Sequence, residues 1–423
     1  MGDRASQLGK RDRKRHLTTR SVRQSQLGFL RRVPQHWQAA PRRWGHRLHS
    51  LCSYMAMFPP AIPHVFIQWL TNHGDVVYDP FSGRGTTALE ACLSGRIGIG
   101  SDANPLAWLL TAAKCDPPAA WGVERRLNEL ESRSRPMAAH TDAAPEIRML
   151  FTPRVLAQLF WLQSELDGSR RVDRYLLAVL AGMLHGNANR NGQPRGLSIP
   201  MPNTFAMAPR YVRQYIRDHK LKPPDLDVLT ALRRRVSTFP LPGQEFRRGS
   251  AWLQDVSRRV RYPQYPPAKL IFGSPPYLEV IKYAKFNWVR HWLIQSDPRQ
   301  VDRQLFTSSS LEKYLSFVTG VVNNLRPILR DDGYLCFVVG DVRRDTTEIN
   351  LARAIADRCF AGSDLRVLGT IRDSLPVQHK VSRIWGARRG RATRTDRIVL
   401  VGGPKAKHLS APLRIDWSSN SEG

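Results

Sequence analysis

A strand that ends on two prolines is the first feature with chemical potential. The stretch "KLIFGSPPYLEV", residues 269–280, runs from an apolar strand pattern into Ser274, Pro275, Pro276 and Tyr277. Proline fixes φ and has no N–H, so it cannot extend the strand. Strand ends of this kind are where open α/β sheets hold ligands and reactive groups. Taken alone, the tetrapeptide is equally well a turn that merely ends a strand.

A glycine-rich turn is the second such feature. "DVVYDPFSGRGTTALEACLSG" (75–95) reads as a strand, a turn and a helix. Gly83 and Gly85 permit backbone conformations and close approaches that a side chain would block, and the helix start offers N–H groups to a carboxylate or phosphate. The next apolar run ends in Asp102, placed to accept the two hydroxyls of a ribose. A tight turn without a ligand is the alternative.

The elements that must position these residues are short apolar runs alternating with helical stretches. This pattern predicts an α/β fold with a mostly parallel sheet. The last two runs lack a convincing helix between them, so we expect them to pair antiparallel. The seven predicted strands cover residues 75–80, 96–104, 244–250, 269–277, 333–342, 365–373 and 396–404.

A long insertion separates the second predicted strand from the third, because some 140 residues are too many for one crossover connection. Apolar spacing predicts helices in "FTPRVLAQLFWLQSEL" (151–166) and "RVDRYLLAVLAGMLHG" (171–186). Residues 187–212 are turn-rich and polar, with scattered arginines and aromatics.

Both chemical features resemble motifs of one family, the amino-methylating DNA methyltransferases that use S-adenosylmethionine. "DPFSGRGTT" resembles the family's cofactor motif, and "MFPPAIPHVFIQWLTNHGD" (57–75) is similar to the proline-containing helix before it. "FGSPPY" (272–277) resembles the catalytic motif Asp/Asn/Ser-Pro-Pro-Tyr. Later stretches (280–293, 325–342 and 380–404) are similar to the rest of the same domain.

The resemblance implies a Rossmann-like class I methyltransferase sheet of seven strands, mostly parallel with the last antiparallel, carrying a large helical and loop-rich insert. Its implied segments are a flexible basic arm (1–44), a cofactor half (45–115), an insert (116–243), a catalytic half (244–408) and a tail (409–423). The implied cofactor contacts are Phe58, Pro59, Asp79, Pro80, Phe81, Ser82, Gly83, Gly85, Thr86, Thr87, Asp102, Asn104 and Ser250.

The resemblance also gives the strand end a role. Ser274 and the carbonyl of Pro275 would accept hydrogen bonds from an exocyclic amine, whose lone pair is otherwise delocalised into the base, and would stabilise its developing charge. The prolines hold that carbonyl rigidly, and Tyr277 would stack on the flipped base. Transfer would be direct, without a nucleophilic cysteine.

One position departs from the family pattern. Many relatives have Gly-Asp at the third strand end, whereas this chain reads "GSA", with Ser250 in place of the acid. A serine hydroxyl still accepts a hydrogen bond, so the expectation is weakened cofactor binding rather than inactivity.

The linear order of segments resembles the family order in which the target-recognition region lies between the two halves. This resemblance makes the insert the candidate DNA reader, with Arg190, Arg195, Asn203, Arg210 and Arg213 as contacts to phosphates or base edges. A purely structural helical insert is the alternative. In the family, a serine at position 274 is associated mainly with N4 of cytosine and an aspartate with N6 of adenine. The sequence therefore favours N4 of cytosine in double-stranded DNA, with N6 of adenine as the alternative.

Composition supports a nucleic-acid partner. The chain has 65 Lys and Arg against 35 Asp and Glu, a net charge of +30, which would repel itself without a polyanion. Five separated cysteines with no C-x-x-C predict neither disulfides nor a metal site. No apolar run has the length of a membrane span or a signal peptide, so we expect a cytoplasmic protein. A cognate restriction endonuclease or solitary action are both open, as are an RNA methyltransferase and a non-catalytic nucleic-acid binder of this fold.

Overall fold

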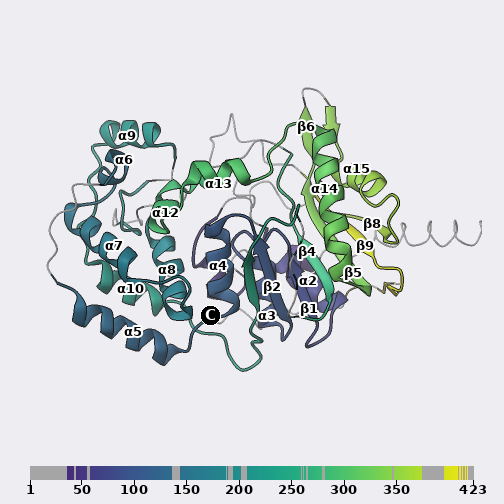
Figure 1. The fold of residues 1–423 in the computed structure, drawn as a ribbon, viewed down its shortest axis with the longest axis horizontal. Helices are drawn as coiled ribbons and strands as arrows, with labels where there is room; N and C mark the ends of the chain where they lie inside the picture. Colours follow the sequence, from purple (N-terminus) through teal and green to yellow (C-terminus); the bar gives the residue numbers. More distant parts are fainter. Residues whose placement is uncertain are drawn as a thin grey trace, which may run out of the picture.

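The computed structural model describes residues 36–417 except 42–43, 55–57, 136–142, 187, 189–193, 202–206, 259, 261, 263–264, 279–281, 345–346, 374–394, 408, 411, 413–414 and 416. Within this part of the chain, a twisted sheet lies beside a group of helices from the insert (Figure 1). The strands of the sheet are β1 (Val76–Asp79), β2 (Ile97–Asp102), β3 (Ser250–Leu253), β4 (Ala268–Gly273), β5 (Leu329–Gly340), β8 (Arg366–Asp373) and β9 (Asp396–Gly402).

The sheet has the order β3-β2-β1-β4-β5-β9-β8. The five strands from β3 to β5 are parallel to their neighbours, and β9 is antiparallel to both β5 and β8. The predicted α/β class, with a mostly parallel sheet and an antiparallel last strand, is therefore confirmed. All four residues of β1 are buried, as expected for a central parallel strand covered on both faces.

The third strand was predicted too early, at residues 244–250. In the structure it begins at Ser250, and residues 244–249 form the connection into it. Their N–H groups bind the ends of helices rather than a neighbouring strand: the Arg247 N–H donates to the Cys92 carbonyl and that of Gly249 to the Cys115 carbonyl. A short hairpin of β6 (Val342–Arg344) and β7 (Thr347–Ile349) was not predicted.

Helices cover both faces of the sheet, because alternate strand residues point to opposite sides. Val76 and Tyr78 of β1 pack with α14 (Leu311–Leu325) and α15 (Leu351–Arg358). Val77 packs on the other face with α2 (Ala61–Leu70). That face also carries α3 (Thr86–Leu93) and α4 (Pro105–Cys115), which contact β1, β2 and β3.

A buried carboxylate joins α2 to α3. Glu90 of α3 accepts hydrogen bonds from His49 at 2.5 Å and from His64 of α2 at 2.9 Å. Burial alone would raise the pKa of Glu90, but these two donors outweigh it and lower the pKa to about 2. The carboxylate is therefore ionised at neutral pH and fixes the two helices against each other.

The insert forms a helical body that shares one apolar core with α4. α7 (Pro153–Glu165) and α8 (Arg171–Met183) confirm the two helices predicted there. Leu110 of α4 and Leu180 of α8 belong to the same buried cluster, and α8 packs directly on α4. The remaining helices of the insert are α5 (Ala120–Arg133), α6 (Pro145–Arg148), α9 (Pro209–Asp218) and α10 (Val228–Val236).

Three short helices follow β4 and return the chain to the sheet. They are α11 (Tyr283–Phe286), α12 (Trp288–Leu293) and α13 (Pro298–Gln304). Arg290 of α12 donates to the carbonyls of Ala181 and Ser53, so this segment is held against α8 of the insert. None of the described helices is both long and apolar enough to cross a bilayer.

The boundaries expected for the arm and the tail need correction where the structure describes them. Trp37 and Trp44 are buried, and the Trp37 indole N–H donates to Asp373 at 3.1 Å. Trp44 also packs edge-to-face on Trp417 of the expected tail, with ring centroids 4.8 Å apart. The packed domain therefore begins by His36 and includes Trp417. Residues 1–35 of the expected arm lie outside the described residues.

Candidate active site

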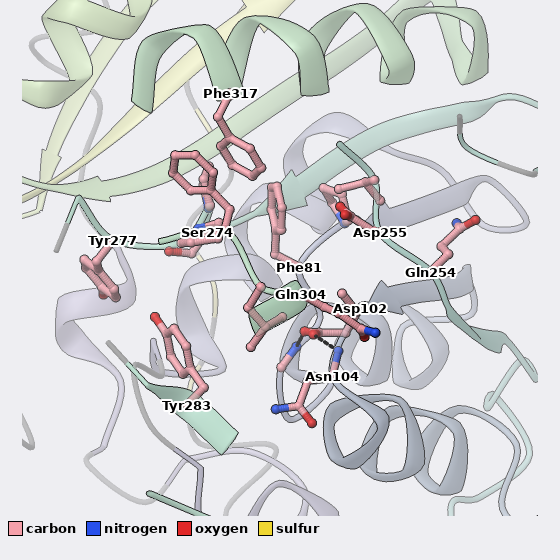
Figure 2. Close-up of a pocket in the computed structure, with 18 of the residues that line it drawn as sticks. Phe81, Asp102, Asn104, Gln254, Asp255, Ser274, Tyr277, Tyr283, Gln304 and Phe317 are labelled. Carbon is pink, nitrogen blue, oxygen red and sulfur yellow. Dashed lines mark hydrogen bonds between the residues drawn. The ribbon is translucent and has the colours of Figure 1, made fainter. Parts of the chain in front are cut away.

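A cleft opens at the carboxyl ends of β1, β2, β3 and β4. It holds about 770 Å³ of empty space, part of it open to solvent. Figure 2 shows Ser274 and Tyr277 on one side of this cleft and Asp102 and Asp255 on the other. The lining residues are Tyr54, Pro80, Phe81, Gly83, Asp102, Ala103, Asn104, Gln254, Asp255, Val256, Ser274, Pro275, Pro276, Tyr277, Tyr283, Gln304, Leu305, Phe306 and Phe317.

Asp102 stands at the end of β2 with both carboxylate oxygens held by the backbone. One oxygen accepts the Gly83 N–H and the other accepts the Asn104 N–H, each at 2.9 Å. Burial raises the pKa of Asp102 to about 6, although these donors pull it down. The carboxylate is thus mainly ionised at neutral pH and has lone pairs left for a ligand's hydroxyl groups.

The glycine-rich turn is held by α4 beneath it. Gly83 and Gly85 both have positive φ, 50° and 77°, which glycine adopts without strain. A Cβ on Gly85 would lie 2.9 Å from the Thr111 backbone. Glycine at this position therefore lets α4 approach the turn and does not widen the cleft. Lys114 of α4 donates to the Arg84 carbonyl at 2.6 Å, and burial lowers the pKa of this lysine to about 7.

The turn and the proline-rich strand end are in direct contact. Asp79, at the end of β1, is buried and accepts the Phe81 N–H at 3.0 Å. A Cβ on Gly273, at the end of β4, would lie 2.6 Å from the Asp79 carboxylate. Glycine before Ser274 therefore lets the two strand ends meet, which fixes their spacing.

The four residues that follow β4 all line the cleft. Ser274, Pro275, Pro276 and Tyr277 leave the sheet without helix or strand structure. Burial raises the pKa of the Tyr277 phenol, although a side-chain hydrogen bond with Ser274 opposes the shift. The phenol is therefore neutral at physiological pH, and its ring and the Ser274 hydroxyl face the same space (Figure 2).

The third strand brings Asp255 to the cleft, whereas Ser250 does not line it. Ser250 pairs with Ile99 at the start of β3, three residues before the level of Asp102. The strand ends at Leu253, so the residues that follow it, Gln254 and Asp255, line the cleft. Asp255 accepts hydrogen bonds from the Ser257 N–H and hydroxyl at 2.9 and 2.7 Å. A carboxylate is thus present at this strand end.

An aromatic wall closes the cleft from the other half of the chain. Phe306 and Phe317 stack with ring centroids 4.0 Å apart, and Phe81 lies 6.2 Å from Phe317. Gln304, at the end of α13, reaches the cleft between Asp102 and Phe81 (Figure 2). Sequence reasoning missed these residues, whereas Tyr283, which also lines the cleft, lies in the stretch 280–293 that resembles the family.

Several expected cofactor contacts do not line the cleft. Phe58 packs edge-to-face on Phe272 in the core, and Pro59 is exposed. The other members of this set support the turn from within the protein: Asp79, Ser82, Gly85, Thr86 and Thr87 are all buried. The expected contacts that do line the cleft are Pro80, Phe81, Gly83, Asp102 and Asn104.

Three of the five expected DNA contacts lie in the described part of the chain, and all three are exposed. Arg210 and Arg213 are exposed on α9, and Arg195 is exposed before the Gly196 turn. Arg190 and Asn203 lie outside the described residues. In the view of Figure 1, α9 lies at the same edge of the molecule as α13, whose last residue lines the cleft.

The described residues contain no cluster of three His, Cys, Asp or Glu side chains that could hold a metal ion. All five cysteines are buried free thiols, and none of them lines the cleft.

Comparison with known proteins gives a match in the first quarter of the chain. A family model described as DNA methylase, of the N6 and N4 type, matches residues 11–108. The Type II methyltransferase M.MvaI of Kocuria varians is 34% identical over 95 residues, which are 22% of this chain and 20% of that protein. The chain thus matches about a fifth of the length of this curated relative.

Solved structures resemble the chain only remotely. TrmN from Thermus thermophilus is 10% identical, with a TM-score of 0.32 over 84% of this chain and 52% of that one. The rRNA methyltransferase aviRa from Streptomyces viridochromogenes is 12% identical, with a TM-score of 0.31 over 88% of this chain and 94% of that one. Neither similarity bears on the substrate. Residues 11–108 of the chain are thus similar to the DNA methylase family of the N6 and N4 type.

Proposed function

We propose that the protein transfers a methyl group from S-adenosylmethionine to the exocyclic N4 amine of cytosine in double-stranded DNA. The observation that carries the proposal is the single cleft shared by Asp102 and the Ser274 to Tyr277 segment. Two chain segments with different chemistry, far apart in sequence, meet there at the ends of β2 and β4, which lie on either side of β1. The matching family model, described as DNA methylase, supports a DNA substrate, and the resemblance suggests a restriction endonuclease as a partner.

The donor set on the β2 side fits S-adenosylmethionine. Asp102 presents an oriented, ionised carboxylate to two ribose hydroxyls, while Phe81 offers a flat apolar face to a purine ring. Asp255, at the next strand end, adds an acceptor for an adenine amino group. When bound, the cofactor supplies a methyl group on a positively charged sulfur.

On the β4 side, the chain's own groups act on the target amine. The Ser274 hydroxyl and the Pro275 carbonyl accept its hydrogen bonds, which draws its lone pair out of conjugation with the base. The two prolines fix the direction of that carbonyl, so little ordering remains for the moment of reaction. Tyr277, neutral and beside Ser274, stacks on the flipped base. Transfer is direct, since no cysteine lines the cleft.

The base and the nitrogen are testable together. We expect N4-methylcytosine at one short sequence in host DNA when the gene is present and its absence when the gene is deleted. Long-read modification mapping, with mass spectrometry of the nucleosides, reports the base, the nitrogen and the site. N6-methyladenine at a defined site would show that adenine, not cytosine, is the target base. Methylation confined to RNA would overturn the proposal of a DNA substrate.

DNA binding through α9 is a further part of the proposal. Its outer face carries Arg210, Arg213 and Tyr211, which is 46% exposed, whereas Val212 is buried against the insert. Tyr211 stacks on Tyr215 with ring centroids 6.0 Å apart. Arginines beside an exposed aromatic ring suit contacts to phosphates and bases.

Replacing Arg210 and Arg213 together by alanine should weaken DNA binding about tenfold at moderate salt and flatten the dependence of log affinity on log salt by nearly two units. Fluorescence anisotropy with a duplex at several salt concentrations measures both. The matched control is Arg353→Ala with Arg358→Ala on α15, which removes the same charge elsewhere. An unchanged salt slope in the α9 variant would remove this helix from the DNA interface.

A further inference from the structure

A second cavity lies at the opposite end of the sheet from the cleft. It holds about 1040 Å³ of empty space, part of it open to solvent, between the starts of α5 and α8 and the approach to β3. α4 begins after the carboxyl end of β2 and ends at Cys115, so its length of about 16 Å separates the two cavities. This second cavity, called here the Trp121 pocket, therefore has no part in the methyl-transfer site.

The Trp121 pocket is strongly cationic. Its lining has two carboxylates, Glu129 and Asp173, and five arginines. The arginines are Arg125, Arg126, Arg170, Arg171 and Arg248. One carboxylate nearby, Asp116, is shared by Arg171 and Arg248 at 3.5 Å each and by Arg174 at 3.3 Å. The local excess of positive charge fits an anionic ligand.

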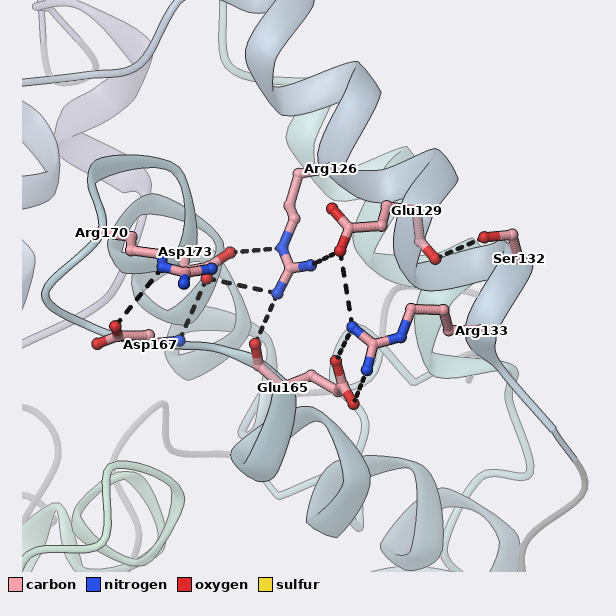
Figure 3. Close-up of polar contacts among 8 residues, drawn as sticks. All are labelled: Arg126, Glu129, Ser132, Arg133, Glu165, Asp167, Arg170 and Asp173. Carbon is pink, nitrogen blue, oxygen red and sulfur yellow. Dashed lines mark hydrogen bonds and ion pairs between the residues drawn. The ribbon is translucent and has the colours of Figure 1, made fainter.

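The floor of the pocket is held by an ion-pair network around Arg126, in which Asp173 is buried and Glu129 is half exposed. Arg126 donates to Asp173 at 2.8 Å, to Glu129 at 2.6 Å and to the Glu165 carbonyl at 2.6 Å (Figure 3). These bonds tie α5 to the ends of α7 and α8. Because Arg126 is fully engaged, it positions the wall, and the other arginines are the ones that can reach a ligand.

Trp121 gives the pocket an aromatic rim. Its side chain is 68% exposed, the largest exposed fraction among the large apolar residues of the described chain. The Arg125 guanidinium lies 5.2 Å from the centre of the indole ring, and no carboxylate of the described residues pairs with it. An exposed indole costs solvation free energy, and with a neighbouring free guanidinium it forms a surface that suits a flat ring joined to a phosphate.

We propose that the Trp121 pocket binds a nucleoside phosphate unit, with the base stacked on Trp121 and the phosphate held by Arg125 and the arginines at positions 170, 171 and 248. The same chemistry occurs in a free nucleotide and in single-stranded nucleic acid. The pocket is independent of the proposed methyl transfer, because it lies at the other end of α4.

Photo-crosslinking of the full-length protein tests the site directly. The probes are 5-iododeoxyuridine monophosphate and an eight-nucleotide single strand that carries one 5-iododeoxyuridine, and mass spectrometry maps the crosslinked peptide. We expect crosslinks at or next to Trp121, which inorganic phosphate suppresses. Crosslinks from both probes would identify a free-nucleotide site, and crosslinks from the strand alone would identify a strand site.

Affinity measurements on variants complete the test. Arg125→Ala and Trp121→Ala should each lower the affinity of the crosslinking probe about tenfold and leave the methylation rate of duplex DNA unchanged. Arg353→Ala, an exposed charge-matched control on α15, should have no effect on the affinity. No crosslink near Trp121, or equal affinity in all variants, would overturn the nucleotide site. Capture of an acidic protein without any nucleotide binding would overturn it as well.

Discussion

Replacing Ser274 by alanine should lower kcat about 100-fold while the affinities for DNA and for S-adenosylmethionine stay nearly unchanged. The hydroxyl is proposed to contact the amine most strongly as charge develops on it, so its loss affects the transition state more than the bound state. Pro275 keeps its carbonyl acceptor in the variant, which explains why some activity should remain. Single-turnover methylation with a saturating duplex measures the effect.

Two further variants make the Ser274 result specific. Ser274→Asp restores an acceptor that the resembling family also uses at this place, so part of the lost rate should return. Ser237→Ala removes an exposed hydroxyl at the end of α10 that donates to the Arg234 carbonyl, and it should leave kcat unchanged. If Ser274→Ala kept a normal rate, the hydroxyl would have no place in the mechanism.

Asp102→Asn should weaken S-adenosylmethionine binding about 10- to 100-fold, because a charged acceptor of the ribose hydroxyls becomes a neutral amide. In the wild-type protein the carboxylate accepts the Gly83 and Asn104 N–H groups. In the variant the amide NH2 would face one of these donors, and that hydrogen bond would be lost. Isothermal titration calorimetry measures the affinity, and thermal unfolding checks that the turn is intact. Asp116→Asn, at the far end of α4, is the matched control.

The pH dependence of binding gives the Asp102 assignment a second readout. The ionised form is the acceptor, and the pKa of Asp102 is raised by burial to about 6. The affinity of the wild-type protein should therefore be constant above this pH and fall as the pH drops below it, about tenfold per unit at the limit. Asp102→Asn has no proton to take up, so its profile should be flat there. A wild-type profile in the variant would contradict the assignment.

The insert packs against the sheet domain through a shared core rather than forming a detached module. Its helix α8 packs on α4, and Arg290 of α12 donates to the Ala181 carbonyl of α8 at 3.1 Å. Val212 of α9 belongs to the same buried cluster, so the proposed DNA contacts on α9 would be connected to the cleft through packed helices. A chimera that exchanges residues 116–243 should therefore keep the side chains that pack against α4. If they were changed, loss of methylation would report misfolding instead of altered recognition.

The sequence predicted most of the sheet, because each strand is a short apolar run with a turn residue at its end. Local patterns of this kind depend on neighbouring residues alone. The same applies to Asp102, Gly83 and the Ser274 to Tyr277 segment, which stand at strand ends that their flanking residues define. Topology then brings them together, since the carboxyl ends of parallel strands share one edge of the sheet.

The sequence pattern did not predict the register of β3 or which side chains are buried. Ser250 lies away from the cleft because the start of β3 is set by its pairing with β2, and a weakly apolar run carries no local sign of that register. Thr86 and Thr87 were expected to face a ligand, but the helix that they begin turns them into the core. Phe306, Phe317 and Gln304 reach the cleft from distant segments.

The sequence by itself thus determined the fold class, the acidic end of β2 and the proline-rich end of β4. Only the tertiary structure decided which carboxylate ends β3, which aromatic rings close the cleft, and that Trp121 and its arginines form a second pocket. The reason is that a strand end is defined by consecutive residues, whereas a pocket is formed by side chains from distant segments that only packing brings together.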